Sequence, residues 1–208
     1  MPITYPISLP SSSGPVEFSW EGESAVARQM TEFTYQSKVY AWEGKLRKAT
    51  VRVGEMPSIA VWKEWQVAML KLNGRDGTFY MQDPIGAVHR GIYNLASPGA
   101  PLVAGGNQNG PDLTTDGWPV SLAGMLKAGD FIAIQGRLYQ LMADATSSAG
   151  GLSTLQIWPH ATPAILDNAV ITVGINAFGT FRLLEFPAFV YDVERCMTGF
   201  AFACEEAF

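Results

Sequence analysis

Few side chains in this sequence could carry acid–base or metal chemistry. The 208 residues include two histidines, His89 and His160. A protein metal site usually needs several His, Cys or carboxylate ligands at close spacing, and neither histidine has such a neighbour in the sequence. Each stands alone among loop-forming residues, as surface histidines do. We therefore expect no catalytic residue, no metal site and no cofactor, while a nucleophile and base that meet only in the fold are left open.

The short motifs that bind phosphate or build a nucleophile are also missing. The sequence contains no GxGxxG at a helix start, no GxxxxGKS/T, no GxSxG and no HExxH. The glycine-rich residues 105–110 could cradle a phosphate, but no lysine or helix start follows, which favours a flexible connection. Aspartate beside glycine or proline usually closes a turn with its own backbone. We expect this role for Asp76, Asp83, Asp116 and Asp130.

Three aromatic residues are the candidates for contact with a ligand or partner: Trp118, Tyr139 and Trp158. They lie within a segment that we expect to fold as a small β-barrel. An exposed tryptophan can stack on a sugar ring, whereas a buried one serves the core. Both interpretations are open at this point, and the core is the more ordinary role.

The composition describes a folded, acidic chain. Hydrophobic residues make up 48% and charged residues 16%, and the formal net charge is -5. An acidic surface repels nucleic acid, which argues against a DNA-gripping protein but suits a surface that DNA slides past. The N-terminus has no basic and apolar leader, and no apolar run approaches the ~18 residues of a membrane span. We expect neither export nor membrane insertion.

The two cysteines, Cys196 and Cys204, lie eight residues apart in one apparent strand. This even spacing places them on one face, yet beyond disulfide reach in an extended chain. We expect two buried free thiols, made in a reducing cytoplasm.

The strongest helix signal lies in residues 56–84. Ser58 follows a proline and is the expected N-cap, and Asn73 with Gly74 can adopt the left-handed conformation that ends a helix. A turn then leads to a short strand at residues 78–81. The helix is expected to place one broad apolar arc against a sheet. That arc contains Ile59, Val61, Trp62, Trp65, Met69, Leu70 and Leu72.

Alternating aromatic and polar residues predict β-structure before this helix. Residues 1–15, rich in proline and serine, are expected to form a flexible or extended N-terminal segment. From Val16 onward the pattern predicts a β-meander, with strands that include residues 31–35 and 38–42 and a turn at Glu43-Gly44. The helix would cover the aromatic face of this meander.

The middle of the chain has a different character. Residues 85–97 are expected to be a crossing linker, and the glycine- and asparagine-rich pattern continues without periodicity to residue 116. Residues 98–173 are expected to form a small barrel of short strands. The predicted strands are residues 131–134, 137–143, 152–158 and 169–173, the first two joined by a Gln135-Gly136 hairpin turn.

The aromatic strand pattern returns at residues 178–184 and 188–204. The alternation near the end places Cys196, Thr198, Phe200, Phe202 and Cys204 on one face. The fold class is therefore mainly β, a β-rich α+β chain. Its expected organisation is a discontinuous hub domain with one amphipathic helix, formed by residues 1–84 plus 174–208, and an inserted barrel.

Several phrases of the sequence resemble one protein family. They are LKLNGRDGTFYMQDP, TTDGWP, LKAGDFI, GRLYQL and LQIWP, followed by FGTFRL and a C-terminal strand. In this order they resemble the distal tail proteins of long-tailed bacteriophages, over about residues 40–208. None of these phrases is a catalytic motif.

The resemblance implies a structural virion protein without enzyme activity. Its hub would resemble a tail-tube domain, and its barrel would be galectin-like or oligonucleotide/oligosaccharide-binding-like. The implied partners are copies of itself in a ring, expected to be a homohexamer, together with the tail tube protein and the tail tip or hub proteins. DNA would be passing cargo only. The location would be the tail tip of the virion, with assembly in the host cytoplasm.

Two other functions are compatible with the same residues. The first is a tip-associated binding module whose barrel contacts host-surface carbohydrate through the three aromatic candidates. The second is an enzyme of another class, such as a cell-wall hydrolase carried at the tip, although no convergent reactive set is apparent in the sequence.

Overall fold

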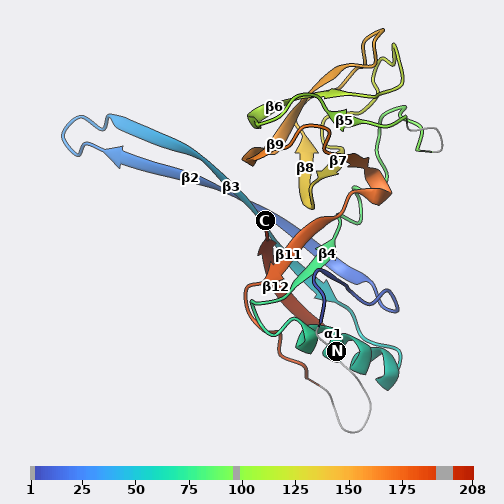
Figure 1. The fold of residues 1–208 in the computed structure, drawn as a ribbon. Helices are drawn as coiled ribbons and strands as arrows, with labels where there is room; N and C mark the ends of the chain where they lie inside the picture. Colours follow the sequence, from blue (N-terminus) through green and yellow to red (C-terminus); the bar gives the residue numbers. More distant parts are fainter. Residues whose placement is uncertain (1–2, 96–98, 191–198) are drawn as a thin grey trace. The chain divides into compact units, whose positions relative to one another are not determined.

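Figure 1 shows a computed structural model of the chain, which describes residues 3–95, 99–190 and 199–208. The chain divides into two compact units, and both are mainly β. Unit 1 contains residues 1–21, 47–83 and 178–208, and unit 2 contains residues 22–46 and 84–177. Residues 22–46, which the sequence pattern assigned to the hub, therefore belong to the same unit as the barrel.

Unit 1 is built on a six-stranded sheet. Its strands are β1 (Ile7–Ser8), β2 (Pro15–Met30), β3 (Ser37–Val53), β4 (Thr78–Met81), β11 (Gly179–Leu183) and β12 (Phe200–Glu206). Their order is β1-β4-β11-β12-β3-β2, with β1 parallel to β4 and the pairs from β4 to β3 antiparallel. The N-terminal and C-terminal parts of the chain thus share one sheet.

The predicted helix is present as α1 (Ile59–Lys71), the one α-helix of the described residues. The Ser58 hydroxyl accepts a hydrogen bond from the backbone N of Val61 at 3.4 Å. After the helix, Asn73 and Gly74 have φ angles of 50° and 71°, the left-handed conformation expected at a helix end. The helix, its N-cap and its stop are confirmed.

The helix buries a narrower stripe than the predicted arc. The buried residues follow the spacing of one helix face: Trp62, Trp65, Ala68 and Met69. They pack against the inward side chains of the sheet, and Trp65 meets Phe200 edge-on with ring centroids 5.6 Å apart. Ile59 and Leu70 lie at the margins of the arc and are exposed, because the sheet contacts only a sector of roughly 100° around the helix.

Replacing Ser58 with alanine is expected to lower the stability of α1 by about 1 kcal/mol, because the backbone N–H of Val61 loses its acceptor. Native-state hydrogen exchange of the α1 amides measures this loss. Ser58→Asp keeps an acceptor at the N-cap and should cost much less. Equal losses in the two variants would show that capping is not the cause.

The region before the helix is one long hairpin, so the predicted meander is wrong in detail. The backbone N of Tyr35 bonds the carbonyl of Thr31 at 2.9 Å, which makes residues 31–36 the turn rather than part of a strand. Glu43 and Gly44 lie inside β3 and form no turn. Gly44 does not adopt a positive φ there, so nothing in its backbone interrupts the extended chain.

Unit 2 contains a second six-stranded sheet, which curls into a nearly closed barrel. Its strands are β5 (Leu102–Val103), β6 (Gln108–Asp116), β7 (Phe131–Ile134), β8 (Arg137–Leu141), β9 (Ser153–Ile165) and β10 (Ile171–Val173), in the order β10-β7-β8-β9-β6-β5. A bridge between Leu102 and Val170 links the two ends of this order. The predicted fold class, β-rich with one helix and a barrel, is confirmed.

The local predictions for the barrel are partly right. The strand at residues 131–134 and its tight turn are confirmed, with φ of 51° at Gln135 and 78° at Gly136. Strand β6, however, occupies residues that were expected to lack regular structure, and β9 continues past Trp158 through a segment expected to be irregular. Register shifts in the β6–β9 ladder accompany this stretch, so its sequence does not show regular alternation.

Strand β12 follows the predicted alternation, but the predicted strand at residues 188–204 is too long, because residues 188–190 and 199 are not in a strand. Phe200, Phe202 and Cys204 are buried on one face of β12. Cys204 is a free thiol, as expected, whereas Cys196 lies outside the described residues. Within the described part of the chain, no helix combines the length and the apolar character needed to span a membrane.

Candidate functional site

The two histidines lie in different surroundings. The ring of His89 bonds the carbonyl of Tyr93 through Nε2 at 2.5 Å. His160 Nδ1 lies 2.9 Å from Glu43 Oε2. Among residues 3–95, 99–190 and 199–208, no three His, Cys, Asp or Glu side chains are grouped so that they could hold a metal ion.

The aspartates predicted to close turns have different roles. Asp130 is buried, and its carboxylate accepts from the backbone N of Lys127 at 2.8 Å, which confirms the turn. The same carboxylate accepts from the backbone N of Arg90 at 2.9 Å and of Gly91 at 3.3 Å. Asp130 therefore ties residues 90–91 to the barrel, a function that the sequence did not indicate.

Asp83 makes a long-range contact within unit 1. It is buried and accepts a short hydrogen bond from Trp20 Nε1. The Trp20 ring also lies 5.1 Å below the guanidinium carbon of buried Arg47. Asp83 thus takes part in a buried polar cluster, which its position before a proline did not predict.

The three aromatic candidates do not meet on one exposed surface. Trp118 is 3% exposed, and its Nε1 donates to Thr115 Oγ1 at 2.8 Å, which confirms the core interpretation for this residue. Tyr139 is 2% exposed and lies 5.5 Å below the guanidinium of Arg137. Trp158 is half-buried against Gly22. Of the three, Trp158 alone keeps a partly open ring.

Cys204, the one cysteine among the described residues, is a buried and unreactive thiol. Burial raises the pKa of the Cys204 thiol to about 12. The nucleophilic form of cysteine is the thiolate. Cys204 therefore remains a neutral thiol near neutral pH and acts as a core residue.

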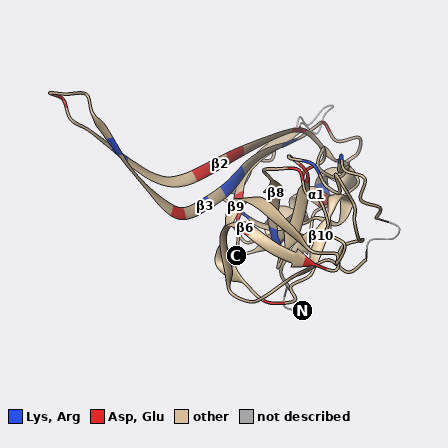
Figure 2. Ribbon diagram, turned by 90° about the horizontal axis from the view of Figure 1, so that it is seen from above, with Lys and Arg blue, Asp and Glu red and all other residues tan. Residues whose placement is uncertain are grey.

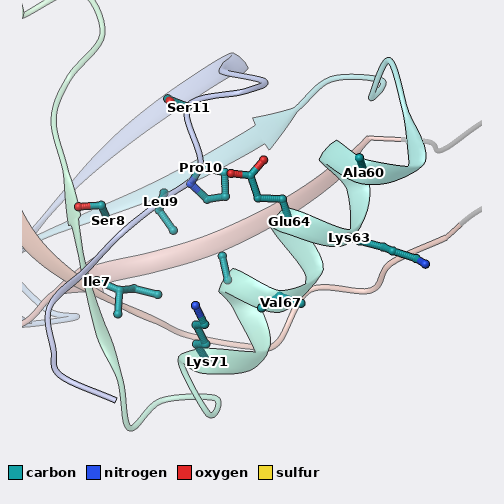
Figure 3. Close-up of a pocket in the computed structure, with 11 residues that line it drawn as sticks. Ile7, Ser8, Leu9, Pro10, Ser11, Ala60, Lys63, Glu64, Val67 and Lys71 are labelled. Carbon is teal, nitrogen blue, oxygen red and sulfur yellow. The ribbon is translucent and has the colours of Figure 1, made fainter. Parts of the chain in front are cut away.

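A groove of about 520 Å³ lies on unit 1, between residues 7–11 and α1 (Figure 3). The Tyr5 hydroxyl donates to the Lys71 carbonyl at 2.6 Å, and Ser12 Oγ donates to Glu64 Oε2 at 2.7 Å. These two bonds hold the N-terminal segment along the helix. The groove has a mixed lining, which includes exposed Val67 together with Lys63, Glu64 and Lys71.

The most distinctive surface is the β-arm, by which we mean residues 22–46. Strand β12 pairs with β3 only at residues 48–53, so residues 37–47 of β3 have β2 as their one neighbour in the sheet order. Both strands are exposed from residue 21 to residue 44. Over these residues the arm is therefore a two-stranded ribbon with exposed residues on both faces.

Apolar and aromatic side chains cover the β-arm. Phe33 at the turn is 94% exposed and Trp42 on β3 is 58% exposed. The other large exposed hydrophobic residues of the arm are Val26, Met30, Tyr35, Val39 and Tyr40. The sequence pattern revealed these alternating residues, but we expected the chain's own helix to cover them. None of them belongs to either hydrophobic core of the described residues.

Charges on the β-arm balance one another. Three acidic and three basic residues are interspersed along it (Figure 2): Glu23, Arg28, Glu32, Lys38, Glu43 and Lys45. The arm has no net charge, whereas the whole chain is at -5. The arm itself therefore adds no net charge to the repulsion between acidic copies of this chain.

No protein-family model matches the chain, and no curated protein matches it.

Proposed function

We propose that this chain is a structural, non-enzymatic component of a phage tail. In this role it forms the distal ring that joins the tail tube to the tail tip by associating with copies of itself. The observation that carries the proposal is the β-arm, which exposes aliphatic and aromatic side chains from both strands and from its turn. Exposed apolar surface of this kind marks protein–protein contacts. The sequence phrases that resemble distal tail proteins support the specific assignment.

Self-association would stabilise the β-arm, which is exposed on both faces in the single chain. An isolated two-stranded hairpin is marginally stable in water. Covering its apolar faces with another protein contributes about 25 cal/mol for each Å² removed from water. A head-to-tail contact of this kind, repeated around an axis, closes into a ring. We expect six copies, with the tail tube protein on one side and the tip or hub proteins on the other.

The charge of the chain fits this role. A ring of chains that each carry a net charge of -5 would present an acidic surface overall. DNA would pass such a surface without binding, because its phosphates find no excess of cations. The proposed location is the tail tip of the virion, reached after assembly in the host cytoplasm.

The double variant Tyr40→Ser/Trp42→Ser tests the role of the β-arm. The two side chains lie on one face of β3, since residues two apart on a strand point the same way. Aromatic residues at interface centres typically contribute roughly 2 kcal/mol each, so losing both should raise the dissociation constant for self-association by roughly a thousandfold. Sedimentation velocity across a concentration series measures this change.

The matched control is Leu152→Ser, which removes an exposed apolar side chain from the barrel. It should leave association unchanged. Negative-stain images of the full chain, alone and mixed with its tail tube protein, should show rings. Monomers at every concentration, together with no ring in the mixture, would overturn the proposed function.

A further inference from the structure

The outward face of β9 changes its exposure along the strand. Alternate residues Thr154 and Gln156 on this face are exposed, whereas Trp158, His160 and Thr162 are half-buried. The residues between them point into the barrel core and are buried throughout this stretch. Other residues of the protein therefore cover this face at Trp158, His160 and Thr162 but leave Thr154 and Gln156 uncovered.

The covering element is the root of the β-arm, by which we mean Gly22, Glu43 and Lys45. At Gly22 the chain packs closely against the indole of Trp158. A Cβ atom added to Gly22 would lie 2.7 Å from one ring carbon of Trp158 and 2.8 Å from another. Real Cβ atoms essentially never approach so closely, so any larger residue at this position would force the Trp158 ring or the chain at residue 22 to move.

A buried arginine binds the arm root to the barrel. Strand β8 pairs with β9 at Gln140 and Leu141. Beyond that ladder, Arg137 Nη1 donates to the carbonyl of His160 at 3.2 Å and, by a short bond, to the carbonyl of Thr162. Arg137 Nη2 donates to the carbonyl of Lys45 at 2.8 Å. One guanidinium thus joins β8, β9 and β3 through charge-assisted bonds.

A third contact lies at the edge of this site. His160 Nδ1 is 2.9 Å from Glu43 Oε2, and the Glu43 side chain is largely exposed. An ion pair with one largely exposed partner contributes little, because water screens it. The indole contact and the buried guanidinium therefore carry most of the interaction.

We propose that the outward face of β9 at Trp158, His160 and Thr162, together with Arg137, is a docking site for the root of this chain's own β-arm. Docking fixes the direction of the arm on the barrel before any partner arrives. An arm that is already fixed loses less conformational entropy when a partner binds than an arm that can swing about its root. Docking therefore lowers the entropic cost of association. The effect on self-association rests on the proposed function, whereas the docking of the arm root on β9 does not depend on it.

The test is a distance measurement between two spin labels within unit 2 of the full chain. Labels at Thr34→Cys and Thr154→Cys, both exposed positions, report on the turn of the arm and on the barrel. Cys196→Ser removes the cysteine that lies outside the described residues, and Cys204 is buried. At a concentration where the chain is monomeric, we expect one narrow distance distribution.

Gly22→Val should broaden that distribution at least twofold, because the added side chain collides with the Trp158 ring. Trp158→Ala removes the same contact without adding bulk and should broaden it as well. Gly44→Ala is the matched control, because its Cβ would meet Ala25 at an ordinary 3.5 Å. Amide exchange in β7 and β8 should stay unchanged in all three variants, which shows that the barrel remains folded.

Two results would overturn the docking. One is a broad distribution in the unmodified chain, and the other is a narrow distribution that survives both Gly22→Val and Trp158→Ala. The variant Arg137→Lys tests the guanidinium itself. A lysine ammonium cannot bond the carbonyls of His160, Thr162 and Lys45 at the same time, so this variant should also broaden the distance distribution. A narrow distribution in a chain that never forms rings would support the docking and count against the assembly function.

Discussion

Replacing Asp130 with alanine should lower the stability of the barrel by about 3–4 kcal/mol. The Asp130 carboxylate is 3% exposed and accepts from the backbone N–H groups of Lys127, Arg90 and Gly91. Hydrogen bonds to a charged group contribute about 1.5–3 kcal/mol each, and losing the acceptor leaves buried donors unsatisfied. Native-state hydrogen exchange of the β7 and β8 amides measures the loss, with the α1 amides as a reference in unit 1.

Two further variants make the test of Asp130 specific. Asp130→Asn keeps one acceptor oxygen and should cost about half as much as the alanine variant. Asp112→Ala removes an exposed carboxylate from β6 and should change stability by less than about 0.5 kcal/mol. If Asp130→Ala also fell within that range, the carboxylate would not be what holds residues 90–91 to the barrel.

The second large effect is expected at the helix of unit 1. Trp65 is 2% exposed and packs edge-on against Phe200. Trp65→Ala removes the indole from the core and leaves a cavity, which typically costs about 3–5 kcal/mol. Exchange of the α1 amides should speed up accordingly, while the β7 amides in unit 2 keep their rates.

Leu70→Ala is the contrasting variant on the same helix. Leu70 belongs to the arc predicted from the sequence, yet it is 59% exposed, so its loss should cost less than about 0.5 kcal/mol. Trp65→Phe should cost less than Trp65→Ala, because Trp65 Nε1 has no hydrogen-bond partner among the described residues. A Leu70→Ala loss as large as that of Trp65→Ala would mean that the broad arc, and not the narrow stripe, faces the sheet.

The features that could be predicted from the sequence are those decided by neighbouring residues. Ser58 caps α1 through a group three residues away, and the Gln135-Gly136 turn needs only two residues that accept positive φ. The short strands β4 and β7, each bounded by turn residues, were also found within their predicted bounds. In these cases residues close in sequence determine the local structure, so the rest of the chain is not needed to predict it.

The features that escaped prediction depend on distant parts of the chain. Alternation at residues 38–42 is the same whether the apolar face is covered by the chain's own helix or left open, so it could not reveal the β-arm. The contact between Gly22 and Trp158 spans more than half of the sequence. Asp130 looks like a turn residue in sequence, and its bond to the backbone N of Arg90 appears only in the fold.

The pairing of β4 with β11 brings together the two ends of the long segment that separates them in sequence. Met81 is the partner of Gly179 in that ladder, and directly opposed residues on antiparallel strands lie about 4.5–5.5 Å apart. The segment of residues 84–177 therefore leaves and rejoins the sheet of unit 1 through adjacent strand ends. Closing a longer excursion there adds little entropy cost. A change in the length of this segment can therefore leave the pairing of β4 with β11 intact.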